Sequence, residues 1–225
     1  NKQIIVGRSF CPKCKKKINW FDNIPLISFI FLFAKCRKCK KEISIKYFFV
    51  ELISGIIFLY LFLNYDNFLE VIFLQTIFLI LLIIFFIDLK YFIIPDSLNY
   101  TLIFLGFIKN YLSNFSSNFF TYDIYQSIIG GLFGFLLIWL IIFIYKKLKK
   151  IEAMGLGDAK FLAAVGVFFG WQSIWSILFV ASVVGIIVIL PSLLKNKRNL
   201  KSTIPFGPYL VISSIIYYNF GNLIM

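Results

Sequence analysis

Long apolar runs, separated by short polar segments, fill the chain from residue 46 to its end. The runs cover residues 47–63, 68–87, 97–111, 126–145, 161–171, 173–194 and 204–225. An α-helix rises about 1.5 Å per residue, so a run of about 20 residues can cross the hydrocarbon core of a bilayer. The pattern predicts an all-α, polytopic helical membrane protein, and a composition with 60% hydrophobic and 15% charged residues agrees with that class.

The stretch from 161 to 194 can form one very long helix or two spans that break at GWQ, residues 170–172. With two spans, the basic segments KKLKK (146–150) and KNKRNLK (195–201) fall on the same side of the membrane as the polar start of the chain. Cytoplasmic loops carry an excess of Lys and Arg, so this arrangement is favoured. We predict about seven transmembrane helices, with the residues before 46 in the cytoplasm.

Small residues predict close packing between some of these helices. One set recurs on one face of the span after residue 158, at Ala159, Ala163, Gly166 and Gly170. Another pair has GxxxG spacing earlier in the chain, at Gly130 and Gly134. Such stripes let helix backbones approach one another in lipid. The span that starts at Asp158 would be only about 20 Å long, which places Asp158 at or within the membrane boundary.

The first 45 residues form a polar head that holds all four cysteines. CPKC (Cys11, Cys14) and CRKC (Cys36, Cys39) are two CxxC knuckles separated by 21 residues. Two such knuckles can complete a tetrahedral metal shell, and a small head with little core gains stability from a bound ion. We predict a structural zinc site in a head domain (1–45), followed by a membrane domain (46–225). Two disulfides are the alternative, which the reducing cytoplasm disfavours.

The net charge is +13, from 23 Lys and Arg against 10 Asp and Glu. In a membrane protein, basic loops set topology and contact anionic lipid. No polar segment is large enough to present an extended groove to nucleic acid. The lipid bilayer is therefore the expected partner of this charge, and nucleic acid is not.

Two aspartates lie where apolar runs meet polar segments. Asp88 ends the run 68–87, and Asp158 opens a span directly after GLG. With seven spans, both fall at cytoplasmic helix ends and can face each other at one depth. An ionised group there is costly. The alternative is that each aspartate is only a polar residue at the end of a membrane helix. The helix dipole favours an acid at an N-terminus, so it can account for Asp158 in this way, but it does not favour Asp88 at a C-terminus.

Two further acids bear on the site. Asp96 follows Pro95 and precedes the run 97–111, a position typical of a helix cap, and it is also a third candidate for acid chemistry. Glu51 lies near the inner end of the first span, where it can pair with a lysine or line a polar cavity.

The residue types narrow the chemistry. The chain has no histidine, which excludes Ser-His-Asp triads, Cys-His pairs and HExxH sites. Two close carboxyl groups can share one proton, so that one takes a proton from water while the other donates to a carbonyl oxygen. Gly155 and Gly157 would let the backbone bend beside Asp158 and let a peptide strand approach.

Four segments in order resemble one known family, the type IV prepilin peptidases, which are GxGD-type aspartic proteases of the membrane. They are a tetracysteine region that runs from CPKC to EISIKYFFVEL (11–52), then FIDLKYFIIPD (86–96), EAMGLGDAK (152–160) and IPFGPYL (204–210). Members of the family usually carry one more span before the cysteines, and the resemblance implies that this chain begins after it.

The resemblance implies that Asp88 and Asp158 are the catalytic pair, that Gly155 and Gly157 shape the site and that Lys160 lies beside it. It also implies that the four cysteines bind zinc. The substrates would be prepilins and pseudopilins, as used in type IV pili and type II secretion, cleaved after a glycine that follows a short basic leader. Many members also methylate the new N-terminus with S-adenosylmethionine.

The family works in the bacterial inner membrane with its active site facing the cytoplasm. A basic leader would be repelled by a basic protein face, and anionic lipid, Glu51, Glu152 or Asp22 can offset this repulsion.

Two other functions compete with the peptidase. A proton-coupled transporter would use buried aspartates as a relay, but such proteins often have inverted repeats and sites at the midplane, which this sequence does not indicate. A zinc-headed membrane scaffold would tolerate Asn at both aspartates and would depend on its cysteines.

Overall fold

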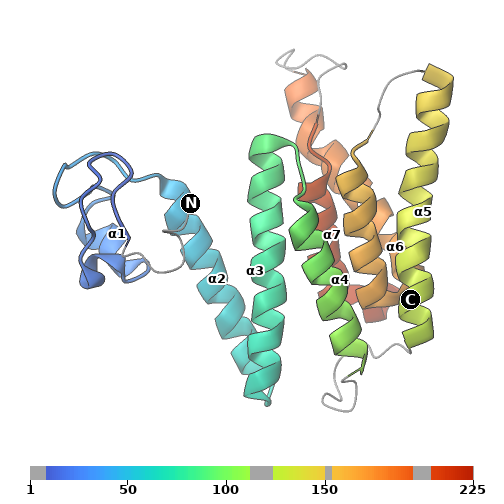
Figure 1. Ribbon diagram of the computed structural model, residues 1–225, viewed down its shortest axis with the longest axis horizontal. Coiled ribbons are helices and arrows are strands. Elements are labelled where there is room, and N and C mark those ends of the chain that lie inside the picture. Colours follow the sequence, from blue (N-terminus) through green and yellow to red (C-terminus); the bar gives the residue numbers. More distant parts are fainter. Residues whose placement is uncertain (1–8, 112–123, 150–153, 195–203, 225) are drawn as a thin grey trace. The chain divides into compact units, whose positions relative to one another are not determined.

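The structure is a computed structural model that describes residues 9–111, 124–149, 154–194 and 204–224. Every regular secondary-structure element in these residues is a helix (Figure 1). They are the 3-10 helix η1 (Trp20–Asn23) and the α-helices α1 (Ile27–Phe31), α2 (Ile45–Asn64), α3 (Phe68–Tyr91), α4 (Asp96–Tyr111), α5 (Ile124–Lys149), α6 (Leu156–Leu194) and α7 (Gly207–Ile224). The predicted all-α class is confirmed.

The chain divides into two compact units, Asn1–Phe78 and Leu79–Met225, with the boundary inside α3. The first unit holds the cysteine-containing head and α2. The second holds the end of α3 and helices α4 to α7. Asp88 and Asp158 both belong to the second unit. The predicted division at residues 45 and 46 stays a prediction.

Among the described residues, four helices are long and apolar enough to cross a membrane: Ile45–Asn64, Phe68–Tyr91, Ile124–Leu148 and Leu156–Pro191. The fourth is interrupted at Gly170, where the backbone has φ 74° and ψ 171°. This confirms the break predicted at GWQ. Glycine adopts this conformation without the penalty that a Cβ atom would cause.

The chain reverses at Gly170 (Figure 1). A Cβ atom on Gly134 of α5 would lie 2.5 Å from the carbonyl oxygen of Leu162, before the break, and 3.2 Å from Ile174 Cδ1, after it. Both parts of α6 therefore pass the same level of α5, and the second part returns toward the end where Asp158 lies.

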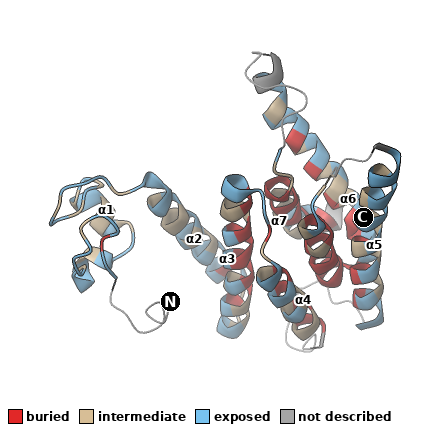
Figure 2. Ribbon diagram, turned by 45° about the horizontal axis from the view of Figure 1, so that its top comes forward, coloured by how far each residue is buried: buried red, intermediate tan, exposed pale blue. Residues whose placement is uncertain are grey.

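Glycines bring α5 and α6 into backbone contact. Gly130 faces the backbone of Gly166, and a Cβ atom on either residue would collide with the other's carbonyl group. Residues 161–170 are all buried, and Figure 2 shows buried residues along α6 and α7 but few on α2. The predicted close packing through small residues is confirmed, and it creates the firm core against which the acids are placed.

Candidate active site and metal centre

Asp88 lies in the last turn of α3. The helix ends because Phe92 adopts a left-handed conformation, φ 58°, and its N–H donates to the Asp88 carbonyl oxygen at 2.9 Å. This is the αL type of helix end. The Asp88 side chain is only 4% exposed. The turn after it leads directly through Ile94 and Pro95 into α4.

Asp158 lies in the first turn of α6, at the third helical residue. Its N–H donates to the Gly155 carbonyl oxygen at 3.2 Å, and the Gly155 N–H in turn faces the Asp158 carboxylate. A carboxylate that reaches back to the residue before the helix satisfies one of the free N–H groups there and suits the helix dipole. Asp158 is 9% exposed, so this local arrangement is also buried.

The two acids meet around Ile94 and Gly207. Ile94 packs on Gly157, where a Cβ atom would lie 3.1 Å from Ile94 Cβ, and also on Gly207 at the start of α7. The Gly207 N–H faces the Asp88 carboxylate. Asp88 and Asp158 lie close enough for their charges to interact. The structure therefore brings together the two aspartates that the sequence predicted as a pair.

One carboxylate oxygen in this cluster has an open hydrogen-bonding position. Asp88 Oδ2 is buried and has no hydrogen-bond partner among the residues that the structure describes. A buried polar atom without a partner is costly, and such atoms concentrate at functional sites. The position is suited to a water molecule or a substrate carbonyl group.

Lys160 follows Asp158 by two residues in α6, and its side chain bonds to α4. Its Nζ donates to Asp96 Oδ2 at 2.7 Å and lies 5.6 Å from the centre of the Tyr100 ring. Asp96 is exposed and is the first residue of α4. The ion pair ties the start of α4 to the start of α6.

Sequence reasoning missed Asn99. This residue is fully buried, and its Nδ2 donates to the Gly157 carbonyl oxygen at 3.3 Å. It therefore holds the glycine segment just before Asp158. Its position three residues after Asp96, on the apolar helix 96–111, was the only available signal.

The two cysteine knuckles are built alike. In the first, the Cys11 N–H donates to the Lys16 carbonyl oxygen at 3.0 Å and the Lys15 N–H to that of Cys11 at 2.8 Å. In the second, Cys36 pairs in the same way with Lys41 and Lys40, at 2.9 and 2.8 Å. Lys15 and Lys40 both have positive φ, 55° and 53°. Each turn thus directs two sulfur atoms to one side.

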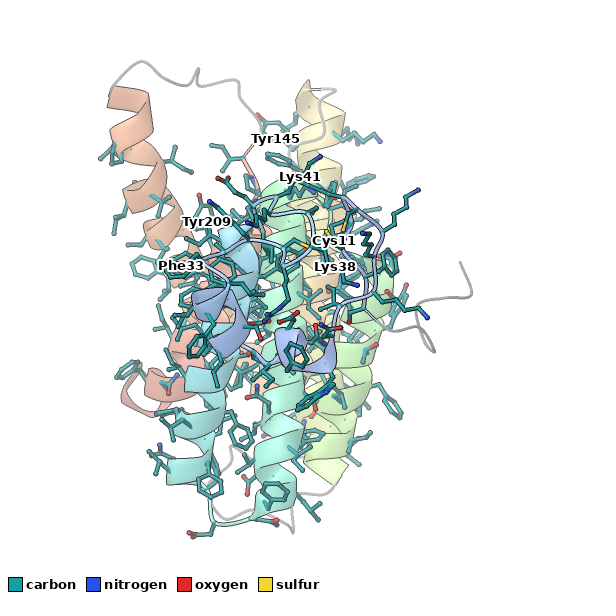
Figure 3. All side chains as sticks on the ribbon, turned by 90° about the vertical axis from the view of Figure 1, so that its left-hand side faces the viewer. Cys11, Phe33, Lys38, Lys41, Tyr145 and Tyr209 are labelled. Carbon is teal, nitrogen blue, oxygen red and sulfur yellow. The ribbon has the colours of Figure 1, made fainter. Side chains whose placement is uncertain are left out.

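The four sulfur atoms fit one tetrahedral metal ion. All lie within 4.8 Å of one another, and the Cys11 and Cys39 sulfurs are 3.9 Å apart. Zn–S bonds of about 2.3 Å in a tetrahedron place sulfurs about 3.8 Å apart. Figure 3 shows sulfur atoms gathered beside Cys11. All four cysteines are free thiols, so the disulfide alternative is not supported.

Hydrogen bonds within the knuckles shift the pKa values of the cysteine thiols. Backbone N–H groups of Cys14 and Lys13 lower the pKa of Cys11 to about 6. The Lys41 N–H has the same effect on Cys39, but burial and the neighbouring cysteine side chains outweigh it and raise the pKa of Cys39 to about 11. A cation among the sulfurs would favour all four thiolates.

Acids in the head have partners of their own. Asp22 accepts from Arg37 in a two-pronged ion pair, with a shortest distance of 2.7 Å. Glu51 Oε2 accepts from the Leu26 N–H at 2.8 Å, which joins the head to α2. In this structure Glu51 therefore bonds to a backbone N–H group of the head and not to a lysine. Glu152 and the segment 195–201 lie outside the described residues.

The fold and the buried acids define a polytopic helical membrane protein with a carboxylate cluster at one end of its bundle. Residues 75–190 match the model of the Type IV leader peptidase family, and residues 1–65 match that of the Bacterial Peptidase A24 N-terminal domain. The chain belongs to the type IV leader peptidase family.

Relatives named prepilin leader peptidase/N-methyltransferase match almost the whole chain. The protein from Aeromonas salmonicida is 32% identical over 98% of this chain and 74% of its own length. Those from Legionella pneumophila and Vibrio cholerae are 32% and 33% identical, over 99% and 94% of this chain and 75% and 81% of their own lengths. No solved structure matches the chain. None of these relatives is named as a transporter, so that alternative is not supported.

Proposed function

We propose that this chain is a membrane aspartic endopeptidase that removes the basic leader of type IV prepilins or pseudopilins. The observation that carries the proposal is the meeting of Asp88 and Asp158, 70 positions apart in the sequence and both buried. A membrane protein has little reason to bury two interacting carboxyl groups unless they are used.

The two aspartates would act as one unit. Two neighbouring carboxyl groups do not both ionise easily, so in this mechanism the pair would share one proton. The ionised group takes a proton from a water molecule, and that water attacks the scissile carbonyl carbon. The protonated group donates to the carbonyl oxygen as charge develops there, and the proton taken from water passes to the leaving amine.

Gly155, Gly157 and Lys160 would shape the site around Asp158. Among the described residues, a Cβ atom added to Gly155 would meet only Asp158 Oδ2, at 3.6 Å, and the Gly157 nitrogen, at 3.8 Å. A substrate backbone can therefore approach this carboxylate closely. Lys160, paired with Asp96, adds a weak tie between the first turn of α6 and the start of α4.

The four cysteines would hold one structural Zn²⁺ ion in the head. The sulfur positions suit four-coordinate zinc, and four protein ligands leave no open position for chemistry. We assign zinc to the folding of residues 1–45 and no step of cleavage to it. Relatives are also named as N-methyltransferases, and we extend that activity to this chain, with S-adenosylmethionine as the methyl donor.

We place the protein in the bacterial inner membrane, with seven spans and the acids facing the cytoplasm. The break at Gly170 divides α6 into two spans, and with α2, α3, α4, α5 and α7 these make seven. Lys146 and Lys147 lie at the end of α5, close in sequence to Asp158, so the positive-inside bias favours a cytoplasmic site.

The test is incubation of the purified protein with a synthetic prepilin in detergent, followed by mass spectrometry of the new N-terminus. We expect cleavage after the leader glycine and a mass increase for methylation when S-adenosylmethionine is present. Asp88→Asn and Asp158→Asn should each abolish cleavage, whereas Asp66→Asn, at an exposed position between α2 and α3, should not. Cleavage by either active-site variant at the wild-type rate would exclude the dyad.

A further inference from the structure

The first part of α6, residues 156–169, is a short helix that carries Asp158 near its start and ends at Gly170. We call it the Asp158 half-helix. Because the helix stops there, its last carbonyl groups have no partner within the helix. Two of them are bonded by side chains of α4. Lys109 Nζ donates to the Phe168 carbonyl oxygen at 2.9 Å, and Asn110 Nδ2 donates to that of Val167 at 2.9 Å.

Both α4 side chains are buried. Lys109 is 8% and Asn110 5% exposed, and Lys109 Nζ lies 5.8 Å from the ring centres of Phe168 and Phe169. Asn110 Nδ2 also donates to Ser127 Oγ of α5 at 2.6 Å. Burying a lysine is costly, but the carbonyl end of a helix carries partial negative charge that attracts a cation.

The other end of the Asp158 half-helix is bonded to the same helix, α4. There Asn99 Nδ2 donates to the Gly157 carbonyl oxygen. Lys109 comes 10 positions after Asn99, and its partner Phe168 comes 11 positions after Gly157, the partner of Asn99. At about 1.5 Å per residue, these stretches are about 15 and about 16 Å long, so α4 matches the half-helix closely in length and bonds it at each end.

The same helix is tied to Asp88. Only seven residues lie between Asp88 and the first residue of α4, and Ile94 among them packs on both Gly157 and Gly207. A shift of the Asp158 half-helix along α4 would therefore move Asp158 relative to Asp88. A displacement of about 1 Å between reacting groups can cost about 100-fold in rate.

We propose that Lys109 and Asn110 are positioning residues for the active site: from the far end of the half-helix, they fix the depth at which Asp158 meets Asp88. The inference rests on the proposed peptidase function. Neither residue contacts the acids. They act by holding the carbonyl end of the half-helix against α4 and α5, while Asn99 holds the amino end.

The experiment compares Lys109→Met, Lys109→Arg and the milder Ser127→Ala, which removes the hydroxyl group that accepts from Asn110. Lys147→Met on α5 and Ser213→Ala on α7 are the matched controls. Lys147 is exposed, and the Ser213 hydroxyl group donates to the Leu210 carbonyl oxygen of its own helix. Each protein is assayed for kcat and KM on a synthetic prepilin. Amide hydrogen exchange is measured over 156–170 and over α7.

We expect Lys109→Met to lower kcat at least about tenfold with KM unchanged, and Ser127→Ala to lower it less. Exchange should rise in 162–170 and not in α7, and Lys109→Arg should restore both readouts because it keeps a cationic donor. The controls should match the wild type.

An unchanged kcat in Lys109→Met would overturn the proposal and show that Lys109 has no role in catalysis. Faster exchange in α7 as well as in 162–170 would also overturn it, because Lys109 would then contribute to the general stability of the bundle. Local loosening with wild-type cleavage would overturn it too. If the wild type cleaves no prepilin, the proposed function fails by itself, and the exchange data alone decide whether Lys109 holds the half-helix.

Discussion

A Cβ atom on Gly207 would lie 2.7 Å from Asp88 Oδ2, so the first residue of α7 is in direct contact with the carboxylate of α3. The same Cβ atom would lie 3.0 Å from Ile94 Cδ1. Both neighbours are buried, which limits how far either can move away. Gly207 thus lets α7 close one side of the acid cluster.

Gly207→Ala should therefore reduce prepilin cleavage while the protein still folds. The added methyl group must displace either the carboxylate or the start of α7, and a small displacement of a reacting group lowers kcat by about tenfold or more. Gly55→Ala is the matched control, because a Cβ atom on Gly55 meets nothing within 4 Å. Equal kcat values in the two variants would show that α7 does not constrain Asp88.

Much of this site could be predicted from the sequence because its parts carry strong local signals. Asp88 and Asp158 stand out as acids beside apolar runs. The CxxC spacing indicates a metal site even when the fold is not known. The break at Gly170 followed from lysine placement. Asn99 and Lys109 could not be assigned roles in this way, since each acts through a contact between α4 and α6, and the sequence alone does not give the register of two helices.

Asp96→Asn should leave cleavage nearly unchanged. Asp96 is exposed, and its ion pair with Lys160 is of the kind that contributes about 0–1 kcal/mol. We expect kcat/KM within about fivefold of the wild type, measured beside Asp158→Asn, which should be inactive. Loss of activity in Asp96→Asn as complete as in Asp158→Asn would make Asp96 a third essential acid.

Gly166→Ala should destabilise the helical bundle. A Cβ atom at this position would collide with the Gly130 carbonyl group, so α5 and α6 must separate. Overpacking of this kind costs about 1–3 kcal/mol. The variant should have a lower midpoint of thermal unfolding in detergent than the wild type. Gly55→Ala again serves as control, and an unchanged midpoint for Gly166→Ala would mean that the backbones do not touch in the membrane.

Removal of the metal should affect the head and leave the helical bundle intact. We expect one zinc ion per chain by elemental analysis, and none after Cys36→Ser or chelation, because three thiolates hold zinc much less tightly than four. Protons compete with zinc for thiolates, so zinc retention should fall as the pH is lowered. Helical content by circular dichroism should stay near the wild-type value. Full zinc content in Cys36→Ser would place the metal elsewhere.

We expect Glu51 to stabilise the head and not to bind the substrate. Its Oε2 accepts the Leu26 N–H at 2.8 Å, and Leu26 has a positive φ of 60° that this bond helps to hold. A hydrogen bond to a charged group contributes about 1.5–3 kcal/mol. Glu51→Ala should therefore expose residues 20–33 to proteolysis, whereas Glu51→Gln, which keeps an acceptor oxygen, should protect them in part.

Substrates with different leader charges test the alternative role of Glu51 in substrate recognition. If this carboxylate attracted the basic leader, Glu51→Gln would raise KM for a prepilin with a full set of leader lysines and would have no effect on one whose lysines are replaced by glutamine. We expect no such difference, because Oε2 is already engaged by the backbone of the head. A KM increase that depends on leader charge, in a variant whose head still resists protease, would assign Glu51 to substrate recognition.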